Sequence, residues 1–216
     1  CHTAWAPQCI GCHNSYEKQT EGFDMLRNIR TNGTWVEYAG EYYADAPVLG
    51  IDENAARGGK VQTMIPGMIL TIDNSTIKNS EGESFHRLYA PASAHTTRRE
   101  SRSCKSCHND PLAIGYGRGT LTYSPSGKWQ FEPKFEKNVH DGLPEDAWTG
   151  FLKNRSGIVS TRKGIQPFNI DEQKKILTAG ACLTCHGENS EIMARSLANF
   201  GELLKARSKK CVLPVW

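Results

Sequence analysis

The chain has 216 residues, which is enough for one or two ordinary domains. Only 38% of the residues are hydrophobic and the mean hydropathy is −0.54, so side chains alone provide a lean core. No stretch approaches 18 consecutive apolar residues, so we expect no transmembrane helix. The formal net charge of +3 is too small to predict a nucleic-acid partner.

The first element along the chain is the pentapeptide CIGCH at residues 9–13, and its pattern recurs as CKSCH at 104–108 and CLTCH at 182–186. This spacing is typical of covalent c-type haem attachment, in which two thiols form thioethers with the haem and the adjacent histidine binds the iron. With 8 Cys and 7 His in the chain, random order gives roughly 0.01 such motif. The predicted thioether residues are Cys9, Cys12, Cys104, Cys107, Cys182 and Cys185. The predicted proximal iron ligands are His13, His108 and His186.

Cys1 and His2 precede the first motif and allow three interpretations. They match the second half of another Cys-x-x-Cys-His motif, which would add a fourth haem with His2 as its proximal ligand. Cys1 could instead pair with Cys211, the other cysteine outside a motif, or carry a lipid as the first residue of a mature lipoprotein. The half-motif interpretation predicts that the sequence is the C-terminal part of a longer chain.

Residues 21–33 predict a short helix with Phe23, Leu26 and Ile29 on one face, ending near Gly33. Residues 34–80 are marked by Gly, Asn and Pro and predict extended segments and turns. Thr97 is expected to cap a helix that carries the second motif.

Residues 121–131, LTYSPSGKWQF, predict a β-hairpin because apolar residues alternate on both sides of a Ser-Pro-Ser-Gly turn. Residues 171–180 predict a helix that ends at Gly180 and leads into the third motif. Apolar residues at helical spacing from Ile192 to Leu204 predict a further helix, whose apolar face is expected to cover the third haem.

The histidines outside the motifs supply a possible second set of iron ligands. Low-spin haems need a sixth ligand, and bis-histidine ligation closes both faces of the iron, so such haems carry electrons and bind no substrate. Three complete motifs and three remaining histidines agree in number. The predicted distal ligands are His86, His95 and His140.

Together these patterns predict one unit over residues 1–216 with a haem-packed multihaem cytochrome c architecture, mainly irregular, with short α-helices and a minor β-hairpin. Six propionates on three haems would shift the formal charge of +3 to about −3.

Zinc is the alternative for paired Cys-x-x-Cys motifs, but zinc needs no histidine after each pair, and three pairs do not divide into four-cysteine sites.

The segments CHTAWAPQCIGCH, AHTTRRESRSCKSCHNDPLAIGYG and the helix followed by CLTCH resemble octahaem cytochromes of the tetrathionate-reductase-like type. The resemblance covers most of this chain, aligned with the C-terminal part of such proteins. It implies His13, His108 and His186 as proximal ligands and His95 as a distal ligand. Three complete motifs stand here rather than eight, so the catalytic haem of that family is not placed on this chain.

The function predicted first is electron transfer between redox partner proteins or other cytochrome subunits, with low-potential haems. Because c-type haem is normally attached outside the cytoplasmic membrane, we expect a periplasmic or extracellular protein whose leader has been removed or lies outside this sequence. Membrane association would come only from a partner or a lipid on Cys1, and a homo-oligomer or haem filament is a further possibility. The alternative is a reductase or oxidase of a small sulfur or nitrogen oxyanion, with positive charge from Lys60, Arg118 and Lys128.

Overall fold

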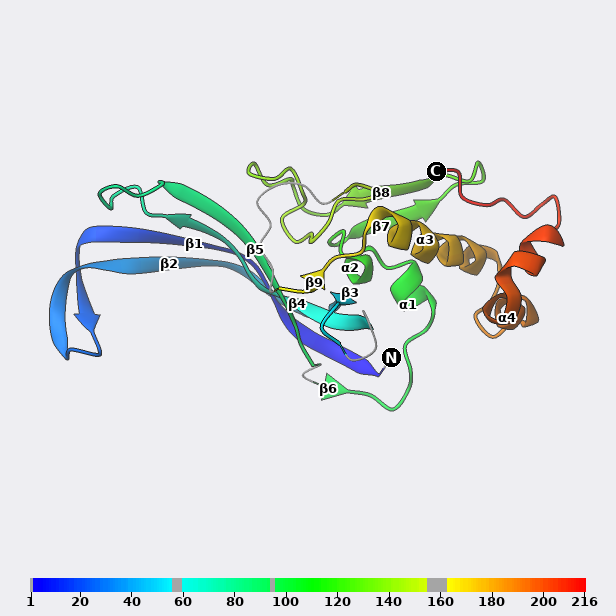
Figure 1. Cartoon of the computed structure of the whole chain (residues 1–216), viewed down its shortest axis with the longest axis horizontal. Helices are drawn as coiled ribbons and strands as arrows, with labels where there is room; N and C mark the ends of the chain where they lie inside the picture. The colour runs from blue at the N-terminus through cyan, green and yellow to red at the C-terminus, as the bar shows by residue number, and fades with distance from the viewer. Residues whose placement is uncertain (1, 56–59, 94–95, 155–162) are drawn as a thin grey trace.

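The computed structural model describes residues 2–55, 60–93, 96–154 and 163–216, and within this part the fold is mainly β. The predicted architecture, mainly irregular with short helices and a minor hairpin, is therefore wrong. A seven-stranded mixed sheet dominates instead, and a two-stranded hairpin and four helices lie beside it (Figure 1). The single-unit boundary at 1–216 stays a prediction.

The large sheet is built on two long strands, β1 (Thr3–Asp24) and β4 (Lys60–Asp73), which run parallel to each other. β2 (Ile29–Asp45) extends the sheet beyond β1, and β5 (Glu83–Pro91) lies on the other edge of β4. β3 (Val48–Asp52) pairs with the first half of β4. Two short strands, β6 (Thr96–Thr97) and β9 (Ile165–Gln166), complete the sheet at β1 and β3.

β5 shows why these segments are strands. Its buried side chains are Phe85, Arg87 and Tyr89, and the residues between them are less buried, which is the two-residue period of a sheet with one covered face. Arg87 follows the pattern although it is charged, because its guanidinium forms a fully buried, two-pronged ion pair with Asp141 and also donates to backbone carbonyls. The arginine ties β5 to the loop that covers the sheet.

The helix predicted at 21–33 is wrong, because these residues form the end of β1, a turn and the start of β2. Asp24 Oδ1 accepts hydrogen bonds from the backbone nitrogens of Leu26 and Arg27, and Asn28 has a left-handed backbone with φ 54°. Both features are typical of a tight turn. Figure 1 shows this β1–β2 pair as a long curved arm that projects away from the helices.

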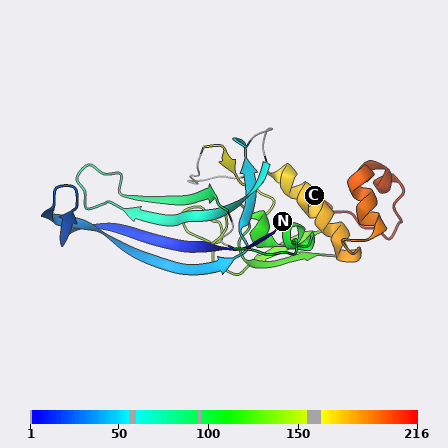
Figure 2. The same ribbon diagram turned by 90° about the horizontal axis from the view of Figure 1, so that it is seen from below.

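The hairpin predicted at 121–131 is confirmed as β7 (Gly119–Tyr123) and β8 (Trp129–Pro133), with Leu121 opposite Phe131. The two C-terminal helices are also confirmed, as α3 (Ile170–Cys185) and α4 (Glu191–Lys205). α3 does not end at Gly180 as predicted but continues through it into the third motif. Figure 2 shows both helices at the end of the molecule opposite the β1–β2 arm.

The helix predicted from Thr97 to the second motif is shorter than expected. Thr97 lies in β6, and the helix α1 spans only Lys105–His108. It is followed by α2 (Pro111–Ile114), which Asp110 caps through the backbone nitrogen of Leu112.

Two buried clusters meet at α2. The first packs the covered face of the large sheet against Leu112 and Trp148, and the second packs the hairpin against α3 around Ile114 and Leu177. α2 thus joins the sheet to the helical end of the molecule. Within the described ranges, none of the helices has the length and apolar character that a membrane crossing requires.

Candidate functional site

The second Cys-x-x-Cys-His motif forms a single helical turn. The backbone nitrogen of His108 donates to the carbonyl oxygen of Cys104 at 3.0 Å, an i to i+4 bond. Residues three and four positions apart lie on one side of a helix, so the thiols of Cys104 and Cys107 and the imidazole of His108 share a face. This is the arrangement that attachment of one haem by two thioethers and one iron bond requires.

The imidazole of His108 is oriented by a neighbouring helix. Its Nδ1 lies 3.0 Å from the carbonyl oxygen of Ile176 on α3. A carbonyl accepts only from a protonated nitrogen, so this bond places the proton on Nδ1 and leaves Nε2 with a free lone pair. Histidines that bind metals commonly use their second ring nitrogen in this way.

The third motif repeats the helical geometry of the second. Cys182 and Cys185 lie in the last turn of α3, and the backbone nitrogen of His186 donates to the carbonyl oxygen of Cys182 at 2.9 Å. Asn169 and Glu172 form a reciprocal capping box at the other end of this helix. The motif is therefore carried on a helix of 16 residues with a well-defined start.

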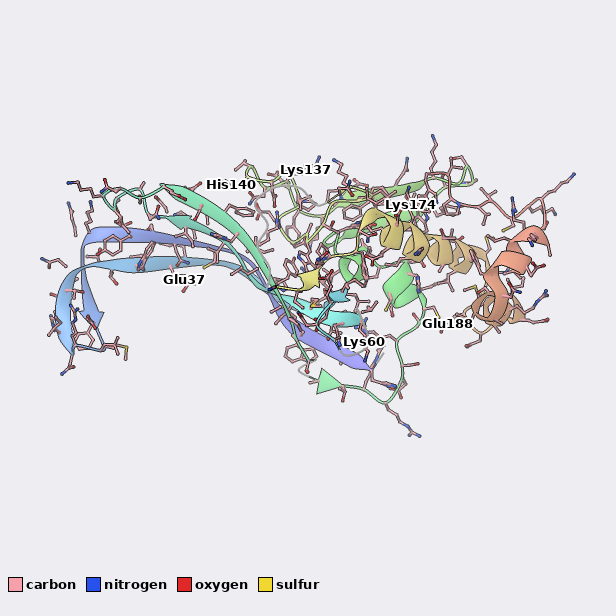
Figure 3. The ribbon with its side chains drawn as sticks, in the orientation of Figure 1. Glu37, Lys60, Lys137, His140, Lys174 and Glu188 are labelled. Atoms are coloured by element: carbon pink, nitrogen blue, oxygen red, sulfur yellow. The ribbon has the colours of Figure 1, made fainter. Side chains whose placement is uncertain are left out.

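The helices that carry the second and third motifs are in contact next to the motifs. The side chain of Asn109 donates to the carbonyl oxygen of Gly180 at 3.2 Å, and a Cβ atom on Gly180 would lie 2.7 Å from the carbonyl oxygen of His108. Glu188 adds a second contact, because its carboxylate accepts a hydrogen bond from the backbone nitrogen of Cys104 at 2.6 Å. Figure 3 shows Glu188 between α1 and α4. The two motifs thus form one packed unit.

Each of these two motifs borders its own cavity. A cavity of about 580 Å³ is lined by Cys104, Cys107 and His108 together with apolar side chains of β3 and β4. A second cavity of about 590 Å³ is lined by the third motif, the turn of the hairpin and the C-terminal segment. Both volumes fall in the usual range for cofactor sites. A four-cysteine zinc site needs two pairs of thiols at one point, whereas these pairs line separate cavities.

The first cysteine of each of these two motifs has a raised pKa. Partial desolvation raises the pKa of Cys104, and the carboxylate of Glu188 raises it further. Burial likewise raises the pKa of Cys182, and the neighbouring thiols of Cys211 and Cys185 add to the effect. In the described part of the chain, no three His, Cys, Asp or Glu side chains are gathered as a metal-ion site.

The first motif has a different geometry, because residues 9–13 lie inside β1. A strand rises about 3.3 Å per residue, so residues 9 and 12 are about 10 Å apart along the strand, against about 4.5 Å in a helix. The thiol of Cys12 donates to Glu37 at 2.8 Å, whereas His13 stacks on Tyr38. These two neighbours therefore point to opposite faces of the sheet. In this conformation the motif does not fit one haem, and the side chain of Cys9 lies outside the described part.

The two predicted distal histidines that the structure describes do not line the two cavities. His86 lies on β5, and the ring of His140 stacks on Phe85 with its Nε2 3.4 Å from a carboxylate oxygen of Glu83. Figure 3 places His140 beside β5, away from α3. Neither residue is among those that line the cavities of the second and third motifs. His95 lies outside the described residues.

The residues at the chain start are only partly described. Cys1 lies outside the described residues, so its half-motif, disulfide and lipid interpretations stay predictions. His2 is exposed, and its carbonyl oxygen accepts from the backbone nitrogen of Arg98. Cys211 lines the cavity of the third motif and is a free thiol.

The cations considered for an oxyanion site do not gather. Arg118 pairs with Asp45 at 3.0 Å, Lys60 starts β4, and Lys128 lies in the turn of the hairpin. None of the three lines either cavity.

Sequence reasoning missed two residues of this region. Glu188 follows the third motif by two positions, but the sequence carries no signal that its carboxylate contacts the second motif. Cys211 was recognised only as a spare cysteine. Its place beside the third motif depends on the path of the C-terminal segment along the hairpin.

Comparison with protein-family models, with curated proteins and with solved structures finds no match to this chain.

Proposed function

We propose that this chain is an electron-transfer protein that carries covalently attached c-type haems at its second and third Cys-x-x-Cys-His motifs. One observation carries the proposal: both motifs form the same helical turn, and the helices that carry them are in contact at Gly180 and Asn109. Haems attached to helices in contact would lie close together, which is what single-electron transfer from haem to haem needs.

Each part of the site has a role in this proposal. Cys104 and Cys107, and likewise Cys182 and Cys185, hold a haem through thioethers, and the following histidine binds its iron. The bond from His108 Nδ1 to Ile176 fixes the ring and makes Nε2 the ligating atom. The cavity beside each motif provides apolar walls that keep water from the porphyrin. A bound haem supplies one reversible electron at its iron.

The location and the family remain parts of the same proposal. Covalent haem attachment places the protein outside the cytoplasmic membrane, and redox proteins or other cytochrome subunits would be its partners. The resemblance to octahaem cytochromes of the tetrathionate-reductase-like type supports the multihaem assignment. Residues 9–13 are not part of the proposed relay, because their strand conformation does not fit one haem.

The test is the intact mass of the polypeptide after export in a host that attaches c-type haem. We expect at least two haem masses per chain. Replacing both cysteines of the second motif by alanine should remove one haem mass, and the same change in the third motif should remove another. Absence of any haem mass, or a mass that the cysteine substitutions leave unchanged, contradicts the proposal.

Kinetic assays then distinguish an electron-transfer protein from an enzyme. With reduced viologen as donor, we expect rapid one-electron reduction of every haem and no turnover of tetrathionate, nitrite or hydroxylamine. Sustained consumption of any of these oxidants would favour a reductase instead.

A further inference from the structure

The cavity beside the third motif contains more ligating groups than haem attachment uses. Three thiols and one imidazole line it, from Cys182, Cys185, His186 and Cys211. Under the proposed function, two thiols become thioethers and the imidazole binds the iron from one side. The thiol of Cys211 is left, on a segment that contributes to the same cavity from outside the motif helix.

The segment that carries Cys211 is held in place by the hairpin. The hydroxyl of Tyr123 donates to the carbonyl oxygen of Val212 at 3.0 Å, and the backbone nitrogen of Val215 donates to the carbonyl oxygen of Gly127 at 2.8 Å. Gly127 has φ +80°, and a Cβ atom there would lie 2.6 Å from the backbone of Leu213, so the segment lies directly on the turn.

A tight turn fixes Cys211 from the other side. Its backbone nitrogen donates to the carbonyl oxygen of Ser208 at 2.9 Å. The position of the thiol is therefore set by bonds both before and after it in the chain.

We propose that the sulfur of Cys211 is the sixth ligand of the haem iron carried by the third motif. This inference rests on the proposed function. On ligation the thiol proton passes to solvent and the sulfur donates an electron pair to the ferric iron, so the oxidation state does not change. Thiolate is an established axial ligand of haem iron.

The other lining side chains are poorer ligands. The hydroxyl of Tyr123 is already used as a donor to Val212, and Lys210 is exposed and keeps its ammonium in water. Ser124 and Ser208 offer only neutral hydroxyls. Of the predicted distal histidines that the structure describes, neither His86 nor His140 lines this cavity.

Thiolate ligation has a defined consequence for the relay. A negatively charged ligand stabilises ferric over ferrous iron, so the third-motif haem becomes the lowest in potential of the haems on this chain. It also closes the second face of the iron, which keeps this haem an electron carrier.

The test compares the ferric holoprotein with its Cys211→Ser variant by electron paramagnetic resonance and by redox titration. In the wild type we expect one haem per chain with the narrow spread of g values that low-spin thiolate haem shows. In Cys211→Ser this signal should be lost, a high-spin signal of equal intensity should appear, and the potential of one haem should rise. Lys209→Ala, a neighbouring substitution outside the cavity lining, should change neither signal nor potential.

The haem count separates the two proposals. If Cys211→Ser retains the wild-type haem mass and also the wild-type spectrum, the ligand assignment is wrong and the haem relay stands. If the wild-type chain carries no haem, both are wrong. As a second variant, Cys211→Met should keep the low-spin state but raise the potential, because a neutral thioether replaces the thiolate.

Discussion

The carbonyl oxygen of His108 lies so close to Gly180 that a Cβ atom on Gly180 would approach it to 2.7 Å. This contact is where the helices of the second and third motifs meet. Two helices approach this closely only where one of them has no side chain. Gly180 therefore sets the spacing between the two motifs.

Gly180→Ala should destabilise the protein by about 1–3 kcal/mol, because the new methyl group meets backbone that cannot move freely. Urea unfolding of the holoprotein measures the change. Gly201→Ala is the matched control in α4, where the nearest atom to the new Cβ is 3.9 Å away. It should be neutral or stabilising by up to about 1 kcal/mol, since alanine favours helix. Equal effects of the two substitutions would contradict a close contact at Gly180.

Arg87→Met should destabilise the fold by about 3–5 kcal/mol, because it leaves the Asp141 carboxylate buried without its partner. The carbonyl oxygens of Glu145 and Ala147 lose their donor as well. Thermal or urea unfolding checks this value. Arg30→Ala, which breaks the exposed pair with Glu21, should cost less than about 1 kcal/mol. A small effect at Arg87 would show that the loop around Asp141 is not anchored as described.

Asn169→Ala should reduce stability by about 0.5–2 kcal/mol, because α3 loses the side chain that caps its first turn. Asn169→Ser keeps a capping oxygen and should recover most of the loss. Circular dichroism and urea unfolding follow both variants. If serine is no better than alanine, the cap at Asn169 is not formed in solution.

Stability should fall as the pH rises above about 10, because burial raises the pKa of Tyr116 above its usual value of 10.0. An unfolded tyrosine loses its proton near that value, while the folded one keeps it. Above this pH the unfolded state binds fewer protons, so deprotonation stabilises the unfolded state relative to the folded state. Tyr116→Phe should make the decline shallower by up to about 1.4 kcal/mol per pH unit. Urea midpoints at pH 9, 10 and 11 measure this slope in both proteins. Parallel slopes would contradict the burial of Tyr116.

The phenylalanine variant carries its own cost at neutral pH. The hydroxyl of Tyr116 donates to Gln173 Oε1 at 2.9 Å, and Gln173 is fully buried. Gln173 Oε1 keeps a second donor, the backbone nitrogen of Leu152, so losing the Tyr116 hydroxyl should reduce stability by about 0.5–1.5 kcal/mol at pH 7.

The C-terminal half of the fold was well predicted because its signals are local. A Ser-Pro-Ser-Gly turn between alternating apolar residues defines the hairpin, and helical periodicity defines α3 and α4. Gly180 was misread as a helix end because glycine usually marks one. Its actual role, close approach to His108, depends on a residue 72 positions away and leaves no trace in the local sequence.

The N-terminal half was not predicted because its strands are held by distant pairing. Residues 21–33 have helical spacing of apolar residues, yet Phe23 pairs with Arg30 across a turn and Leu26 is almost fully exposed. β1 also pairs with β4, about 60 residues later. Spacing within one segment does not reveal such partners.

The candidate site shows the same difference between local signals and distant contacts. Spacing alone identified the three motifs, and the structure gives two of them the shared helical face that the chemistry requires. The supporting contacts from Ile176, Glu188 and Cys211 come from other segments and were found only in the fold.

The bond from the Cys104 nitrogen to Glu188 links the start of one motif to the end of the other. Together with the contacts at Gly180, it means that neither motif helix can fray without breaking bonds to its neighbour. Local opening in proteins follows such cooperative units. The amide hydrogens of α1 and of the last turn of α3 should therefore exchange with solvent in a single event, at one common rate.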